Sequence, residues 1–155
     1  MTTNILSPLF HYKFFTIWGL SLYILYIIFF NIYPMPLYIT NFIISLIITI
    51  GIYGNLIMQL NKKRIINKHP FLKNYINIID IILHIIPLIH ILHYKNYYIS
   101  NSLNPTNKAM SIILILILVS VYLNIHNIEK VYFDINKYIL IIPSLLLFST
   151  NLYFI

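Results

Sequence analysis

The stretch from Asn74 to Tyr94 reads NYINIIDIILHIIPLIHILHY and is long and apolar enough to cross a lipid bilayer. It carries the polar and ionisable residues Asn77, Asp80, His84, His90 and His93. An ionisable side chain in hydrocarbon is costly, so a residue of this kind inside a span is a candidate functional residue. Asp80 is the only carboxylate in any apolar segment of the chain. The stretch therefore predicts a membrane helix that carries a polar site.

The composition of the whole chain indicates the same class of protein. Its 155 residues are 60% hydrophobic and only 8% charged, whereas soluble domains have about a quarter of charged residues. Such a chain cannot cover a globule with polar surface, so the bilayer is expected to be its solvent. The sequence predicts a single all-α integral membrane domain over residues 1–155. The absence of cysteine excludes disulfides, thiolate metal sites and cysteine nucleophiles.

The hydropathy pattern predicts a polytopic bundle of about five transmembrane helices joined by short loops. The expected spans are approximately 9–33, 37–60, 71–94, 109–125 and 138–155. Ser7-Pro8 is typical of a helix start, because Ser caps free N–H groups and Pro fits the first helical position. Pro34 and Pro36 predict the end of the first span, because proline disfavours helix before it.

Basic residues are concentrated between the second and third spans, and the net charge of the chain is +7. The segment 61–73 is expected to be a loop that contains Lys62, Lys63, Arg64, Lys68 and Lys73. Under the positive-inside rule this loop and the N-terminus are cytoplasmic, and the C-terminus lies on the opposite side. Charges confined to short loops indicate contact with anionic lipid, so the lipid bilayer, and no nucleic acid, is the expected partner.

The second span carries polar residues at intervals of four, namely Asn41, Ser45 and Thr49, followed by Asn55 and Gln59. This spacing places them on one side of a helix, where they suit hydrogen bonds between helices. Gly51 and Gly54 permit close approach of a neighbouring helix. We interpret this set mainly as residues that fix helix packing.

Asp80 and His84 are four residues apart in the third span, so their side chains can meet. A carboxylate that accepts from an imidazole fixes its tautomer and leaves the other nitrogen as a base. The alternative is a polar pair that satisfies itself inside the bundle and only fixes packing. The paired-histidine spacing of helical zinc sites is absent, so neither a metal site nor a cofactor is predicted.

Three motifs resemble those of the androgen-induced and androgen-dependent TFPI-regulating protein family of multi-pass membrane threonine hydrolases. FHYKFFTIW at residues 10–18 is similar to the aromatic-rich segment of that family that contains the proposed nucleophile. Leu83-His84-Ile85-Ile86-Pro87 is similar to the span that contains the proposed base, and His126 followed by Val131-Tyr132-Phe133 is a looser counterpart of a later element. The resemblance implies Thr16 as nucleophile and His84 as base. It also implies hydrolysis of lipid esters, such as fatty acid esters of hydroxy fatty acids, through an acyl-threonine.

Helix geometry permits these residues to meet. Counted from Pro8, Thr16 lies about 12 Å along its helix, while counted from Pro70, Asp80 and His84 lie about 15 Å and 21 Å along theirs. Both helices are expected to enter from the cytoplasmic side, and the fourth returns His126 to that side. The expected catalytic residues are Thr16, His84 and Asp80, and His126 and Asn77 are further candidates.

A non-enzymatic role is the alternative hypothesis. The chain is rich in Ile, Asn, Tyr and Lys, and Ala109 is its only alanine, which indicates an AT-rich genome. The alternative is a structural component or a small pore of an AT-rich virus or organism. The two hypotheses differ in whether the polar face of the third span performs chemistry or only packs.

Overall fold

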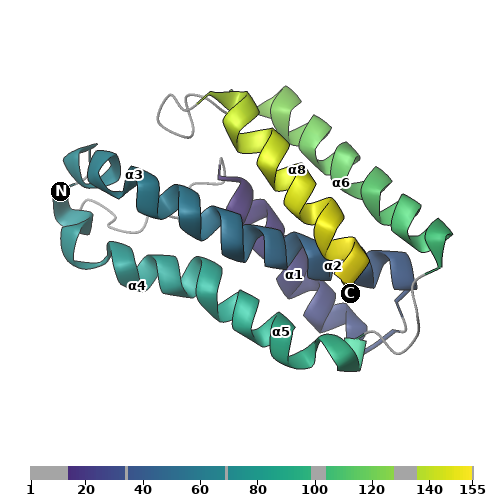
Figure 1. The fold of residues 1–155 in the computed structure, drawn as a ribbon. Helices are drawn as coiled ribbons and strands as arrows, with labels where there is room; N and C mark the ends of the chain where they lie inside the picture. Colours follow the sequence, from purple (N-terminus) through teal and green to yellow (C-terminus); the bar gives the residue numbers. More distant parts are fainter. Residues whose placement is uncertain (1–13, 34, 69, 99–103, 128–135, 155) are drawn as a thin grey trace.

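The computed structural model describes residues 14–33, 35–68, 70–98, 104–127 and 136–154. These residues form an all-α bundle in which no strand occurs, so the predicted fold class is confirmed (Figure 1). The expected helix start at Ser7-Pro8 and the first residues of the expected span 9–33 lie outside the described residues.

Two of the helices are long and each contains one π-helical turn. The first comprises α2 (Leu37–Thr49), the π turn η1 (Ile50–Gly54) and α3 (Asn55–Lys68). The second comprises α4 (Ile76–Asp80), the π turn η3 (Ile81–Ile85) and α5 (Ile86–Tyr98). The remaining elements are α1 (Phe15–Phe30), the short 3-10 helix η2 (Pro70–Asn74), α6 (Pro105–Ile125) and α8 (Lys137–Phe154).

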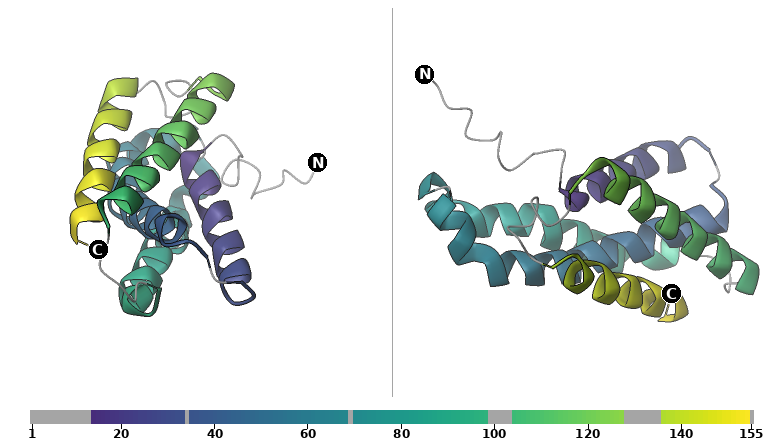
Figure 2. Two further views of the ribbon diagram at one scale, coloured as in Figure 1. Left: turned by 90° about the vertical axis from the view of Figure 1, so that its right-hand side faces the viewer. Right: turned by 90° about the horizontal axis from the view of Figure 1, so that it is seen from above.

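The helix α2 is the packing centre of the bundle. It contacts α1, α5, α6 and α8, and every residue from Thr40 to Gly51 is buried. In Figure 1 the long helix of α2 and α3 crosses the middle, between α4–α5 on one side and α6 and α8 on the other. The end-on view in Figure 2 shows the other helices arranged around it. A largely apolar helix suits this position, because its whole circumference leaves the solvent.

Three helices of the described chain are long and apolar enough to cross a membrane, namely Leu37–Asn67, Ile76–Lys95 and Pro105–Ile125. Two shorter apolar helices, Phe15–Phe30 and Lys137–Leu152, complete the bundle. Large apolar side chains are exposed on the outer faces, for example Ile28 at 51%, Ile82 at 51% and Ile117 at 54%. This pattern is compatible with a location in a membrane.

The expected loop at 61–73 is wrong for most of its length. The helix α3 continues to Lys68, and after His69, which is outside the described residues, the short helix η2 begins at Pro70. Residues 55–68 include Leu, Met, Gln, Lys and Arg, which are strong helix formers. A helix can therefore extend past the apolar segment into polar surroundings without interruption.

The helix α6 also begins earlier than the expected span 109–125. Asn104 is its N-cap and accepts a hydrogen bond from the backbone N–H of Thr106 at 2.9 Å, while Pro105 occupies the first turn. Both residues are favourable at a helix start. The basic residue Lys108 therefore belongs to the helix rather than to the preceding loop.

A tyrosine compensates for the proline inside α8. Pro143 has no N–H, so it cannot donate to the carbonyl of Ile139 four residues before it. The hydroxyl of Tyr53 in η1 donates to that carbonyl instead. The contact ties the central helix to α8 at a point where the helical hydrogen bonds of α8 are interrupted.

Replacing Tyr53 with Phe is expected to lower the free energy of unfolding by about 0.5–1.5 kcal/mol, because the carbonyl of Ile139 loses the hydrogen bond that Tyr53 donates. Pro143→Ala restores a backbone N–H in α8, so Tyr53→Phe should cost less in that background. Reversible unfolding in detergent of the four proteins of this double-mutant cycle measures the coupling. A coupling energy of zero would contradict the compensation.

Candidate functional site

A chain of hydrogen bonds connects α1 to the helix that contains η3. Thr16 Oγ1 lies 3.3 Å from His84 Nε2, and His84 Nδ1 lies 2.7 Å from Asp80 Oδ1. Asp80 and His84 are both buried, with 3% and 4% of their surface exposed, whereas Thr16 is partly exposed. The structure thus brings together the three residues that the sequence singled out as nucleophile, base and orienting carboxylate.

The second carboxylate oxygen of Asp80 is held by two amides from α3. Asn55 Nδ2 donates to Asp80 Oδ2 at 3.1 Å, and Gln59 Nε2 donates to the same oxygen. Both residues were expected to fix helix packing. Their spacing of four residues was the available signal, but it does not reveal which neighbouring helix they face.

The hydrogen-bond donors define the tautomer of His84. An ionised carboxylate only accepts hydrogen bonds, so Asp80 Oδ1 accepts from the N–H at His84 Nδ1. The lone pair at His84 Nε2 then faces the hydroxyl of Thr16. This is the arrangement of hydroxyl, imidazole and carboxylate that activates a hydroxyl nucleophile.

Two glycines of η1 determine how closely the central helix approaches His84. A Cβ atom at Gly54 would lie 2.6 Å from His84 Cδ2 and 2.7 Å from His84 Nε2. At Gly51 it would lie 2.7 Å from Leu88 Cβ and 3.0 Å from the carbonyl oxygen of His84. The expected close approach at these glycines is therefore present, and at Gly54 it is directed at the imidazole ring of His84.

The π turns η1 and η3 pack against each other at this site. A π turn adds a residue to a helical turn, and such turns are frequent at functional sites. η3 ends two residues before Pro87, which cannot donate to the carbonyl of Leu83. A regular α-helical periodicity of 3.6 residues does not predict such turns from the sequence.

Asn77 lies outside the hydrogen-bonded chain. Its side chain is exposed, and its Oδ1 accepts a hydrogen bond from Lys62 Nζ at 2.6 Å. This contact links α3 to α4 one turn before Asp80. The structure therefore gives Asn77 a role in joining two helices and no contact with Thr16 or His84 among those described.

His126 is on the opposite side of α1 from Thr16. Its ring packs edge-on against Trp18, with centroids 5.8 Å apart, and lies 5.2 Å from the ring of Tyr122. Trp18 follows Thr16 by two residues, which is about 200° around a helix. The described contacts of His126 are with Trp18 and Tyr122, and its sharing a cavity with Thr16 stays a prediction.

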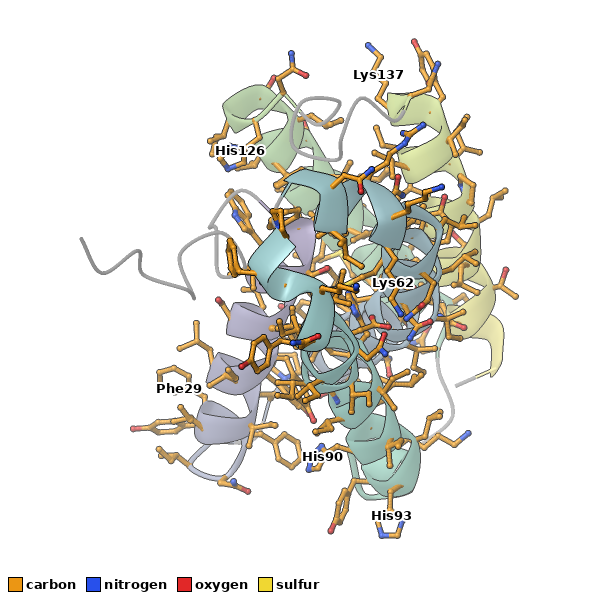
Figure 3. All side chains as sticks on the ribbon, turned by 90° about the vertical axis from the view of Figure 1, so that its left-hand side faces the viewer. Phe29, Lys62, His90, His93, His126 and Lys137 are labelled. Atoms are coloured by element: carbon orange, nitrogen blue, oxygen red, sulfur yellow. The ribbon has the colours of Figure 1, made fainter. Side chains whose placement is uncertain are left out.

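The other histidines of the long helix lie farther along it. The hydroxyl of Tyr23 and His90 Nδ1 are hydrogen bonded, and His93 is exposed beside Tyr94. Figure 3 shows His90 and His93 at one end of the view and His126 at the other. Within the described residues, no cluster of three metal-ligating side chains occurs.

Comparisons with protein-family models, with curated proteins and with solved structures find no significant match. The functional interpretation of the site therefore depends on its own geometry.

Proposed function

We propose that the chain is an integral membrane hydrolase that cleaves acyl esters of lipids, with Thr16 as nucleophile, His84 as general base and Asp80 as the residue that orients His84. The observation that carries the proposal is the continuous chain from Thr16 Oγ1 through the imidazole to the carboxylate. The 3.3 Å separation between hydroxyl and imidazole is within the range of catalytic hydrogen bonds before substrate binds.

The proposed reaction follows the acyl-enzyme pathway. Thr16 Oγ1 attacks the ester carbonyl while its proton moves to His84 Nε2. The tetrahedral intermediate then expels the alcohol, which takes that proton from His84, and leaves an acyl group on Thr16. Water attacks the acyl group with His84 again as base, so that the carboxylic acid is released and Thr16 is restored.

The position of Thr16 in its helix supports this chemistry. Thr16 is the second residue of α1, which begins at Phe15. The N-terminal end of a helix carries a partial positive charge and favours anions. It would therefore stabilise the negative charge that develops near Thr16 during the attack.

A lipid substrate fits the surroundings of the site. On the helix that carries Asp80 and His84, the neighbouring residues Ile78, Ile81 and Ile82 are 56%, 48% and 51% exposed. Acyl chains would pack on such apolar surface at about 0.8 kcal/mol per buried CH₂. The resemblance of residues 10–18 and 83–87 to the membrane threonine hydrolases supports the same substrate class.

The proposed topology has five spans, with the N-terminus and the basic segment 61–73 in the cytoplasm and the C-terminus on the opposite side. Lys62, Lys63 and Arg64 lie at the C-terminal part of α3, one to two turns beyond Gln59. Under the positive-inside rule this end faces the cytoplasm. Within the described residues, the shortest of the helices proposed as spans is α1, which has 16 residues and is about 24 Å long.

Labelling with a fluorophosphonate probe tests the proposed function. The purified protein should form a covalent adduct that peptide mass spectrometry locates at Thr16. Thr16→Ala should abolish the adduct, and Thr16→Ser should retain it, because both hydroxyls are activated by the same imidazole.

Ser21→Ala is the matched control on the same helix. Its hydroxyl donates to the carbonyl of Ile17 at 2.8 Å and is exposed, so its loss should leave labelling unchanged. Absence of labelling in the folded wild-type protein, or labelling that survives Thr16→Ala, would refute the hydrolase and favour the non-enzymatic alternative.

A further inference from the structure

We propose that Asn55 and Gln59 are positioning residues that keep Asp80 ionised and thereby hold His84 in the tautomer that faces Thr16. This inference rests on the proposed function. It assigns to α3 a part of the catalytic machinery that no motif in the sequence identifies.

The buried setting of Asp80 creates the need for such residues. Asp80 is 3% exposed and is the only carboxylate side chain among the described residues. A carboxylate in an apolar setting is stable only when it is paired and hydrogen bonded. Lys62 donates to Asn77, and the contacts described at Asp80 are with the amides of Asn55 and Gln59 and with His84. Asp80 therefore depends on neutral donors.

The two amides are suited to discriminate between the protonation states of Asp80. Both present their N–H groups to Oδ2, and His84 Nδ1 occupies Oδ1. An amide N–H donated to a carboxylate forms a stronger hydrogen bond than one donated to the neutral acid. The two amide donors at Oδ2 therefore favour the ionised form of Asp80.

The protonation state of Asp80 determines the tautomer of His84. An ionised Asp80 requires a hydrogen at His84 Nδ1 and leaves Nε2 free to accept the proton of Thr16. A protonated Asp80 can donate to Nδ1 instead, which moves the imidazole hydrogen to Nε2. His84 would then donate to Thr16 and could not act as its base.

The helix that supplies the amides also shapes the imidazole site. η1 contacts the π turn η3, and α3 contacts α4. Gly54 lies in η1, and Asn55 and Gln59 lie in the first part of α3. Gly54 leaves room for the His84 ring, while the next residue and the one a turn later bind Asp80. One helical segment thus sets both the position and the protonation of the base.

The experiment uses Asn55→Leu, Gln59→Met and the double variant in the full-length protein. Each replacement removes an amide and keeps a side chain of similar size. Asn61→Leu is the matched control, because Asn61 is a buried amide on the same helix that donates to the carbonyl of Ile57 in its own helix. The single variants keep the proposal testable if the double variant does not fold.

Two spectroscopic readouts do not depend on hydrolysis. The infrared band of a protonated carboxyl should be absent from the wild-type protein at neutral pH and appear in the double variant. Its loss when Asp80→Asn is added to the double variant assigns it to Asp80. Nitrogen NMR of labelled histidine, with His84 assigned through His84→Gln, should show a shift from the Nδ1–H to the Nε2–H tautomer. The Asn61→Leu protein should match the wild type in both.

The labelling rate of Thr16 supplies the third readout. At neutral pH it should fall at least about tenfold in the double variant and recover as the pH is raised, because the carboxyl of Asp80 has lost the hydrogen bonds that favour its ionised form. A merely structural loss would lower the rate at every pH.

The outcomes separate this inference from the proposed function. An unchanged Asp80 band and an unchanged His84 tautomer in both single variants and the double variant would overturn the role of Asn55 and Gln59, whatever the labelling shows. Failure of the wild-type protein to be labelled at Thr16 would instead refute the hydrolase, and the two spectroscopic readouts would still decide the state of Asp80.

Discussion

Gly54→Ala should leave the protein folded and reduce the labelling rate of Thr16 at least about 100-fold, which is the cost of displacing a catalytic group by about 1 Å. The added Cβ would lie 2.6 Å from His84 Cδ2 and 2.7 Å from His84 Nε2. Carbon atoms do not approach so closely, so the imidazole must turn or shift. Its Nε2 is the atom that faces Thr16, and therefore the displacement acts directly on the proposed proton transfer.

The stability of the Gly54→Ala protein should remain close to that of the wild type. Alanine in a helix is favoured over glycine by about 1 kcal/mol. The lost hydrogen bond between Thr16 and His84 costs about the same amount. Thermal unfolding in detergent measures the net effect alongside the labelling rate.

Gly19→Ala is the matched control for this substitution. Its Cβ would meet Ile50 Cδ1 at 2.0 Å, but that atom is the end of a flexible side chain that can move away. Labelling should therefore stay near the wild-type rate. Equal labelling of the wild-type and Gly54→Ala proteins would show that the position of the His84 ring does not control Thr16.

The fold class followed from composition and hydropathy, but the helix at the centre of the bundle did not. The sequence predicts a polar site on the span with Asp80 and His84, but it does not predict that α2 is the helix that contacts most of the others. Its polar residues were expected to bond between helices, and Thr49 does accept from Asn151 Nδ2 at 3.3 Å. The side chains of Asn41 and Ser45 are buried without a hydrogen-bond partner among the described residues. Spacing along one helix identifies a polar face but not the neighbour that the face meets.

The contacts of the candidate site were predictable to different degrees for the same reason. Asp80 and His84 are on one helix, so their spacing was sufficient to predict their contact. The contact of Thr16 with His84 depends on how α1 packs, and it was expected from helix depth and from the resemblance. The binding of Asn55 and Gln59 to Asp80 depends on the register of α3 against α4, which the π turns alter.

Asp80→Asn should fold and yet lower the labelling rate of Thr16 by about 10⁴-fold, as in Ser-His-Asp triads in which the carboxylate is replaced by an amide. Asn55 and Gln59 both direct N–H groups at the position of Asp80 Oδ2, so the new amide must place its oxygen there. Its NH₂ group then faces His84 Nδ1 and donates to it. The imidazole hydrogen moves to Nε2, and His84 can no longer accept the proton of Thr16.

Asp80→Ala should instead destabilise the protein, by about 1–3 kcal/mol, the cost of leaving a buried hydrogen-bond donor unsatisfied. His84 Nδ1–H would lose its acceptor in a buried site, and the amides of Asn55 and Gln59 would lose theirs at its partly exposed edge. Unfolding in detergent measures this loss, and histidine NMR of the Asp80→Asn protein measures the tautomer. A folded Asp80→Asn protein with the wild-type tautomer and the wild-type labelling rate would show that the carboxylate is not needed. The amide would then position His84 equally well, and the charge of Asp80 would have no part in activating Thr16.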